Sequence, residues 1–206
     1  MTTRAPRPAN RARALLHVAS ALVAVLFLQQ MSTDMVVWVA SAAFVWAWGM
    51  EIGRRQSATV NRFLMWVFGP VAHPHEREGI NSATWYTTAL FGLSLTHQPM
   101  LCSLGVTVLG FGDPMAAVVG RRFGRILLAA GRTLEGSLAF VLFDGAAAFA
   151  ALQVCYPAIT PLSALWLALG ASGAGAVAEV AARRVDDNLA IPLAAAAGAA
   201  MVAAAL

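Results

Sequence analysis

Two neighbouring stretches of the chain combine carboxylates, arginines and glycines in a pattern that suits phosphate chemistry. They contain Gly112, Asp113, Gly120, Arg121, Gly124 and Arg125, then Arg132, Thr133, Glu135, Gly136 and Ser137. Glycine lets backbone N–H groups approach phosphate oxygens, and arginine offers those oxygens a planar fork of donors. A helix that begins near Gly136 would add unpaired N–H donors and the positive end of its dipole. These residues therefore predict a polyphosphate site within 112–137.

The acidic residues in and beyond this region suggest a metal ion. Asp113 lies in an apolar run, where an ionised carboxylate is costly unless it is paired or solvated. An Mg²⁺ ion that bridges it to a nucleotide would explain its position. Asp186, Asp187 and Asn188 form a second candidate Mg²⁺ site, because hard cations prefer oxygen ligands. A solvated loop that neutralises the two preceding arginines is the simpler alternative for that group.

Simpler explanations also exist for parts of the phosphate pattern. The segment 121–125 has the composition of a basic cluster that follows a membrane span, and Thr133 with Glu135 could cap the next helix. The tripeptide 131–133 imitates the end of a P-loop. Ile126 occupies the position of the first P-loop glycine, so P-loop chemistry is excluded.

The elements that must position these residues are membrane helices. Of the 206 residues, 59% are hydrophobic and 12% are charged, and a helix needs about 20 apolar residues to cross about 30 Å of hydrocarbon. The apolar runs predict spans at about 14–30, 35–51, 81–97, 100–119, 136–155, 160–181 and 189–206. We expect an all-α, polytopic integral membrane protein of about seven transmembrane helices, forming a single domain over 1–206.

Three shorter features refine this expectation. Segment 60–72 is apolar but short and is bounded by proline and glycine, which favours an interfacial or re-entrant helix over an eighth span. Gly170, Gly173 and Gly175 are expected to let two helices approach closely. Asp144 is an acid inside a predicted span and fits no pattern; it could pair with a neighbour or touch a substrate hydroxyl.

The arginines orient the predicted helices. Every basic residue is an arginine, and all 14 fall within 1–13, 52–80, 120–135 and 182–188. The positive-inside rule then places the N-terminus and the phosphate residues on the cytoplasmic side and the C-terminus outside. Orientation and lipid headgroups also account for the pI of about 10.0, so nucleic acid is not expected as a partner.

The motifs at 112–124 and 132–139 resemble a family signature. The first reads GD-x-x-A-x-x-x-G-R-x-x-G, and the second reads R-T-x-E-G-S-x-A. This pattern is similar to that of the CTP-dependent lipid kinases, which include dolichol, phytol and diacylglycerol kinases, and it is distantly shared with phosphatidate cytidylyltransferases. Further matches are Arg13 with His17, Glu51 with Arg54 and Arg55, Glu179, and 186–192. The family more often has lysine where this chain has Arg132, a substitution that keeps the charge.

The resemblance implies transfer of the γ-phosphoryl group of CTP to the hydroxyl of a membrane isoprenoid alcohol or of diacylglycerol. It implies Mg²⁺ as cofactor, held by Asp113 or by the group at 186–188. Arg132 would neutralise phosphate charge, and Glu135, Glu51 or His17 would accept the alcohol proton. The residues expected to bind the nucleotide are Gly112, Gly120, Arg121, Gly124, Arg125, Thr133, Gly136 and Ser137.

Two other functions remain open at this point. One is cytidylyl transfer to phosphatidate, which the shared motif permits. The other is a non-catalytic membrane protein, such as a small transporter or scaffold, although the sequence shows no convincing internal repeat. Association between copies of the chain is also left open.

Overall fold

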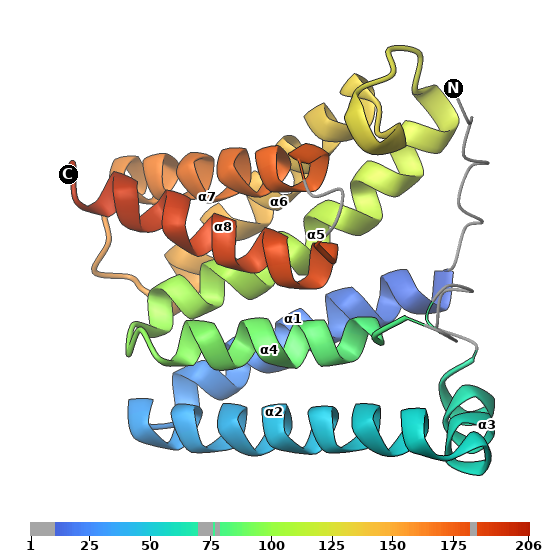
Figure 1. Cartoon of the computed structure of the whole chain (residues 1–206). Helices are drawn as coiled ribbons and strands as arrows, with labels where there is room; N and C mark the ends of the chain where they lie inside the picture. The colour runs from blue at the N-terminus through green and yellow to red at the C-terminus, as the bar shows by residue number, and fades with distance from the viewer. Residues whose placement is uncertain (1–10, 70–75, 77–78, 182–184) are drawn as a thin grey trace.

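The computed structural model describes residues 11–69, 76, 79–181 and 185–206, and these are almost entirely helical (Figure 1). In chain order the helices are α1 (Arg11–Gln30), α2 (Thr33–Gln56), α3 (Ala58–Phe68), α4 (Ser82–Ser94), α5 (Pro99–Phe123), η2 (Ala129–Gly131), α6 (Leu134–Cys155), α7 (Pro161–Ala181) and α8 (Asp187–Ala203). Here η2 is a single 3₁₀ turn, and one isolated antiparallel bridge joins Leu127 to Thr133 beside it.

The lengths of these helices support an integral membrane protein. Within the described residues, α1, α2, α5, α6 and α7 are long and apolar enough to cross a membrane. The apolar helix α8 has 17 residues and α4 has 13, so both are shorter than a full span. Each predicted span coincides with a helix, which confirms the all-helical fold and supports the membrane assignment. The count of seven spans and the cytoplasmic N-terminus stay predictions.

Short polar residues fix where several helices begin. Ser32, before α2, and Thr133, before α6, each accept a hydrogen bond from a backbone N–H in the first turn. Asp186 does the same before α8, accepting from Asn188 N–H at 3.0 Å. Such caps satisfy donors that the first turn of a helix leaves unpaired. The boundaries of α6 and α8 matter most, because the predicted site residues lie beside them.

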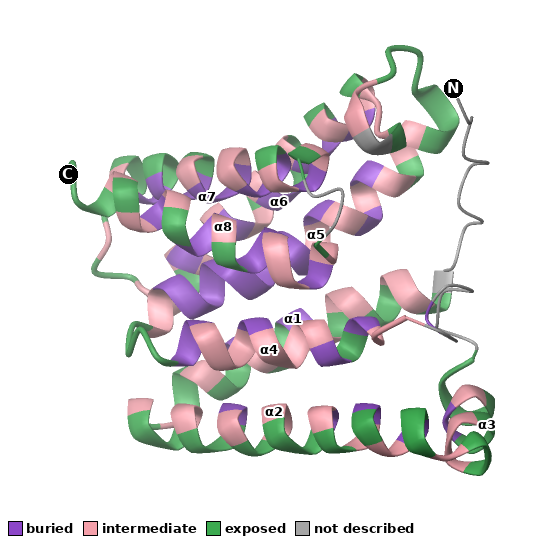
Figure 2. Ribbon diagram, viewed as in Figure 1, coloured by how far each residue is buried: buried purple, intermediate pink, exposed green. Residues whose placement is uncertain are grey.

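Helix α5 is the centre of the arrangement. It packs against α1, α4, α6, α7 and α8, whereas α2 packs mainly against α4 (Figure 1). The buried residues gather on α5 and on the faces of α7 and α8 turned toward it (Figure 2). Helix α2 instead leaves large apolar side chains exposed, Trp38 and Trp46 among them. In a bilayer these side chains would face lipid.

Two of the three predicted packing glycines lie at helix contacts. A Cβ atom on Gly170 would stand 3.0 Å from the carbonyl oxygen of Gly198 on α8, and one on Gly175 would stand 2.7 Å from Val108 on α5. The prediction is therefore confirmed for these two. A Cβ atom on Gly173 would meet no other atom within 4 Å, so the prediction is wrong there. Gly173 faces open space, although it belongs to the same helix.

The ambiguous segment contains the short helix α3, which crosses the end of α2 (Figure 1). Its 11 residues reach about 16 Å at 1.5 Å per residue, about half of the hydrocarbon thickness. Trp66 is 78% exposed and Phe63 is exposed beside it, while Leu64 is buried. This geometry favours the interfacial alternative. Residues 70–72 of the predicted segment lie outside the described residues.

Candidate functional site

Arg132 is surrounded by carboxylates from three different helices. It follows η2 and precedes α6, and its Nη1 lies 3.2 Å from Glu179 Oε1 of α7 and 4.0 Å from Asp113 Oδ1 of α5. Its Nη2 donates to a carboxylate oxygen of Asp187 at the start of α8. Asp113, Arg132 and Asp187 were each predicted as site residues from separate segments. The fold brings these three together with Glu179, which the family resemblance had also singled out.

The electrostatics of this cluster hold Arg132 in its charged form. Its side chain is only 17% exposed, and burial lowers the pKa of a guanidinium. The neighbouring carboxylates of Asp187, Glu179 and Asp113 act in the opposite direction and outweigh burial, so the pKa of Arg132 is raised. Three carboxylates facing one guanidinium leave a formal excess of negative charge. The cluster is therefore suited to a further cation.

The donor set suits Mg²⁺, but the acids do not form a ready-made metal site. Carboxylate oxygens are ligands that Mg²⁺ prefers. Among the described residues, no three acidic, histidine or cysteine side chains lie close enough together to hold a metal ion. The guanidinium of Arg132 lies among the acids instead. Asp113, Asp187 and Glu179 could thus hold a cation once Arg132 turned toward another anion.

The three residues of the predicted metal group at 186–188 make different contacts. Asp187 contacts Arg132, whereas Asp186 caps α8. Asp186 Oδ1 also accepts a hydrogen bond from the Asn188 side-chain nitrogen at 2.6 Å, and Asn188 is buried. The capping contacts give Asp186 and Asn188 a structural role. Their part in metal binding stays a prediction.

His17 lies beside the cluster on α1. Its Nδ1 is 3.9 Å from Asp113 Oδ2, which is too long for a hydrogen bond. This nitrogen is buried and has no hydrogen-bond partner among the described residues. A buried imidazole nitrogen without a partner is uncommon, because desolvating a polar group is costly. An unpaired nitrogen near Asp113 keeps His17 a candidate for the predicted role of base.

The glycines of the phosphate pattern bring α5 and α6 together. A Cβ atom on Gly136 would lie 3.0 Å from the carbonyl oxygen of Ala116, and one on Gly120 would lie 3.6 Å from the Cα of Gly136. Gly124 ends α5 beside Thr133. Gly112 lies against α6, where an added Cβ would stand 2.7 Å from the ring of Phe140. Close helix packing accounts for the small residues.

The start of α6 differs from the expected phosphate cradle. The helix begins at Leu134, and the Gly136 N–H donates to Thr133 Oγ1 at 3.2 Å. The expected unpaired donor at Gly136 is therefore already engaged, and Thr133 acts as the N-cap. Glu135 accepts the backbone N–H of Ile126 at 3.3 Å, which steadies the loop between α5 and α6. Nucleotide contacts of these residues stay predictions.

The remaining predicted nucleotide residues border the cluster. Ser137 Oγ donates to Glu179 Oε2 at 3.4 Å and so supports one of the acids around Arg132. Arg121, in the last turn of α5, and Arg125, in the loop that follows, are exposed. Exposed arginines on this loop retain their side-chain freedom. They fit either a nucleotide or lipid headgroups.

Glu51 belongs to a separate cluster. Its carboxylate accepts hydrogen bonds from Arg54 at 2.8 and 2.9 Å and from Arg55 at 2.7 Å. It also accepts the Asn81 N–H at 3.3 Å, which ties α2 to the start of α4. Glu51 is therefore an ion-pair partner of Arg54 and Arg55, and its role as a base stays a prediction. The described contacts do not connect Glu51 to Arg132.

Sequence reasoning missed Glu76. This residue is 1% exposed and accepts hydrogen bonds from Arg13 Nη1 at 3.0 Å and Ser82 Oγ at 2.8 Å. It thus connects the first helix to the start of α4. The sequence around Glu76 has no helical or strand periodicity, and its arginine partner is 63 residues away. No local signal distinguishes it from the acid at position 78.

Asp144, left unassigned by the sequence, lies on α6 and is fully buried. Neither of its carboxylate oxygens has a hydrogen-bond partner among the described residues. It faces the backbone of α5, because a Cβ atom on Gly112 would lie 2.8 Å from Asp144 Oδ2. The acid therefore lies directly behind the backbone that carries Asp113.

Comparison with known proteins gives one partial similarity. A 58-residue part of the chain is 40% identical to a dolichol kinase of Saccharomyces cerevisiae. The match covers 28% of this chain and 11% of the yeast protein, so most of that relative has no counterpart in the alignment. No protein-family model matches the chain, and no solved structure matches it. The partial match is therefore a similarity to one part of a dolichol kinase, and the apolar helices support a protein that lies in a membrane.

Proposed function

We propose that this chain is a CTP-dependent kinase that phosphorylates the hydroxyl of a membrane isoprenoid alcohol or of diacylglycerol. The observation that carries the proposal is the convergence of Asp113, Glu179 and Asp187 on Arg132. Phosphoryl transfer needs little covalent help from a protein and depends on positioning and charge stabilisation. A buried arginine among carboxylates supplies both kinds of charge that a metal–nucleotide complex requires.

The chain's own residues would act by exchanging partners. The triphosphate would draw the Arg132 guanidinium away from its carboxylates, because phosphate offers bidentate acceptors of higher charge. The released acids, Asp113 and Asp187 with Glu179, would then hold Mg²⁺. When bound, Mg²⁺ would neutralise charge on the phosphate oxygens. Arg121 and Arg125 on the adjoining loop would steady the outer phosphates.

The reaction balances with one proton acceptor. The alcohol oxygen attacks the γ-phosphorus, the bond from that phosphorus to the β-phosphate oxygen breaks, and CDP leaves. The alcohol proton passes to a base. His17 is favoured over Glu51 and Glu135 for this role, because its Nδ1 lies 3.9 Å from Asp113 and has no described partner. The carboxylate of Glu51 already accepts hydrogen bonds from arginines, and that of Glu135 accepts one from a backbone N–H.

The proposal is tested with purified protein in detergent micelles, Mg²⁺, and CTP labelled at either the α or the γ phosphate. Polyprenols, phytol, diacylglycerol and phosphatidate serve as acceptors. We expect γ label in an alcohol lipid, and loss of this transfer in Asp113→Asn. The matched control is Asp34→Asn, which changes an exposed acid at the start of α2.

Other outcomes would overturn the kinase assignment. Label from the α position in phosphatidate would identify a cytidylyltransferase. Absence of transfer to every acceptor, from a folded protein, would favour the non-catalytic alternative. Equal loss of transfer in Asp34→Asn and Asp113→Asn would remove the link between activity and the Arg132 cluster.

A further inference from the structure

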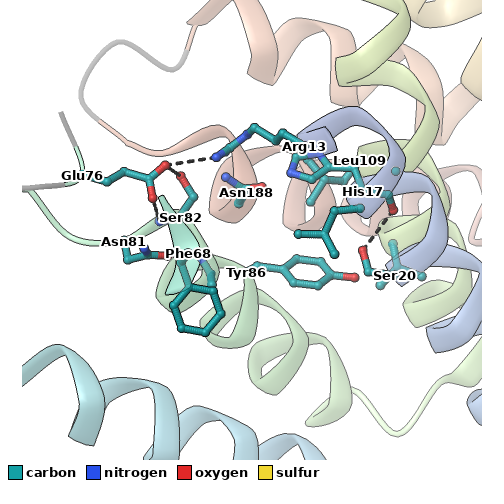
Figure 3. A pocket seen from close by; sticks show the side chains of 14 residues that line it. Arg13, His17, Ser20, Phe68, Glu76, Asn81, Ser82, Tyr86, Leu109 and Asn188 are labelled. Atoms are coloured by element: carbon teal, nitrogen blue, oxygen red, sulfur yellow. Dashed lines mark hydrogen bonds and ion pairs between the residues drawn. The ribbon is translucent and has the colours of Figure 1, made fainter. Parts of the chain in front are cut away.

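A cavity of about 220 Å³ lies between α1, α4, α5 and α8, next to the Arg132 cluster. One part of its wall is polar or charged, and another part is apolar. Figure 3 shows Arg13, Glu76, Ser82 and Asn188 gathered on one side, with Tyr86 and Leu109 on another. Such a cavity is suited to a molecule with one polar end and one hydrocarbon end.

The polar side is held in place by its own hydrogen bonds. Glu76 receives Arg13 Nη1 at 3.0 Å and Ser82 Oγ at 2.8 Å, and it is almost fully buried. Ser82 Oγ also lies 3.5 Å from Asp186 Oδ2 at the start of α8. These contacts fix three separate segments around one end of the cavity. The polar wall is therefore arranged before any ligand arrives.

His17 belongs both to the cavity wall and to the surroundings of Asp113. Its side chain lines the cavity, and its Nδ1 lies 3.9 Å from Asp113 Oδ2. The imidazole of His17 therefore connects the cavity to Asp113 of the Arg132 cluster, and a hydroxyl group beside it would lie at the end of the cavity nearest that cluster.

The rest of the wall is hydrocarbon. Leu16 of α1, Phe68 at the end of α3, and Val106 and Leu109 of α5 contribute apolar surface. These apolar side chains form a surface against which the hydrocarbon part of a ligand can pack.

We propose that this cavity is the acceptor subsite, which takes the hydroxyl end of a lipid alcohol and places the hydroxyl beside His17. The proposal rests on the kinase function proposed above and locates its acceptor. Glu76, Arg13 and Ser82 act as positioning residues, since they hold the α1 and α4 walls together. The chain of the alcohol leaves past the apolar residues of α1 and α5.

Binding is tested apart from turnover, by photolabelling in detergent micelles without nucleotide. The probe is a long single-chain alcohol that carries a diazirine near its hydroxyl. Ala83, an exposed residue of α4 that lines the cavity, is changed to Trp to fill the space. Ala42→Trp, at an exposed position of α2, is the matched control. Thermal unfolding verifies that both variants are folded.

We expect label in peptides of α1 and α4, competition by unlabelled single-chain alcohol, and about tenfold weaker labelling in Ala83→Trp, equivalent to about 1.4 kcal/mol of binding free energy. Ala42→Trp should label like the unchanged protein. Labelling that Ala83→Trp leaves unchanged, or that no lipid alcohol competes for, overturns the subsite. If the protein transfers phosphate but the label lies outside the cavity, this inference is wrong and the kinase proposal stands. If the cavity is labelled but no phosphoryl transfer occurs, the kinase proposal is wrong and the cavity remains a binding site for the alcohol.

Discussion

Arg132 is the residue on which the candidate site depends. Replacing it by Gln or by Lys distinguishes the effect of its positive charge from the effect of its planar guanidinium group. Arg132→Gln should lower the free energy of unfolding, by at most about 3–5 kcal/mol, because it leaves the buried Glu179 and the partly buried Asp187 without their cation. It should also abolish phosphoryl transfer. Arg132→Lys should retain most of the stability, and part of the activity, since it keeps the charge but loses the fork. Thermal unfolding in micelles and the labelled-CTP assay measure the two effects.

A double variant verifies the cause of the destabilisation. Arg132→Gln combined with Glu179→Gln removes one uncompensated acid and should recover part of the lost stability, while activity stays absent. If the double variant is no more stable than Arg132→Gln alone, the loss does not come from unpaired charge. Activity in either Gln variant would contradict the role of Arg132 at the triphosphate.

The residues show what the sequence could and could not supply. Asp113, Arg132 and Asp187 are predictable, because acids and arginines at the ends of apolar runs need a reason to be there. Residue type alone does not distinguish Glu51 from these acids. Its ion pairs with the arginines three and four residues later do, and their spacing on a helix is visible in the sequence. Glu76 depends on a contact across 63 residues. Only the fold reveals such a pairing.

At the scale of elements, the contact between α7 and α8 offers a matched pair of substitutions. Gly170→Ala would place its Cβ 2.5 Å from Val202 Cγ2 and 3.0 Å from the Gly198 carbonyl oxygen, whereas Gly173→Ala meets open space. Overpacking a closed contact costs about 1–3 kcal/mol. We therefore expect Gly170→Ala to lower the thermal midpoint and Gly173→Ala to leave it unchanged or raise it. Equal effects would contradict the close approach of the two helices.

Helix α3 should lie at the membrane surface. In a background with Cys102→Ala and Cys155→Ala, a spin label at Trp66→Cys should report a shallow depth, because an interfacial helix buries its apolar face by only about 5–10 Å. The control label at Leu142→Cys is on the exposed, lipid-facing side of α6 and should be deep. Relaxation by oxygen and by a polar nickel complex measures both depths. Equal depths would indicate a re-entrant segment.

Helix existence was predictable from hydropathy, but lengths were less so. The span predicted at 136–155 is observed as Leu134–Cys155, because a cap at Thr133 defines its start. The span predicted at 81–97 ends as a helix at Ser94, followed by a turn in which His97 takes a positive φ of 53°. Caps and turns decide where a helix begins and ends, and composition does not reveal them. Composition alone therefore misplaces helix ends in both directions.

For the whole molecule, the orientation in the membrane is the main prediction still to be measured. The 22 residues of α6 measure about 33 Å along the helix, which is enough to place its two ends on opposite faces of a membrane. In the same cysteine-free background, Thr160→Cys should react with an impermeant maleimide in intact cells. Ile126→Cys should react only after permeabilisation, because the arginine-bearing loop is predicted to be cytoplasmic. The reverse pattern would invert the topology.

The central position of α5 has a consequence for how the protein is made. Helices α1, α2 and α4 leave the ribosome before α5, yet α6, α7 and α8, which cover much of its surface, follow it. Asp187, at the start of α8, becomes available to Arg132 only after more than fifty further residues have been synthesised. Until then α5 lacks its contacts with the later helices, either in the bilayer or beside an insertion factor. The packing around α5 is thus complete only after α8 has been synthesised.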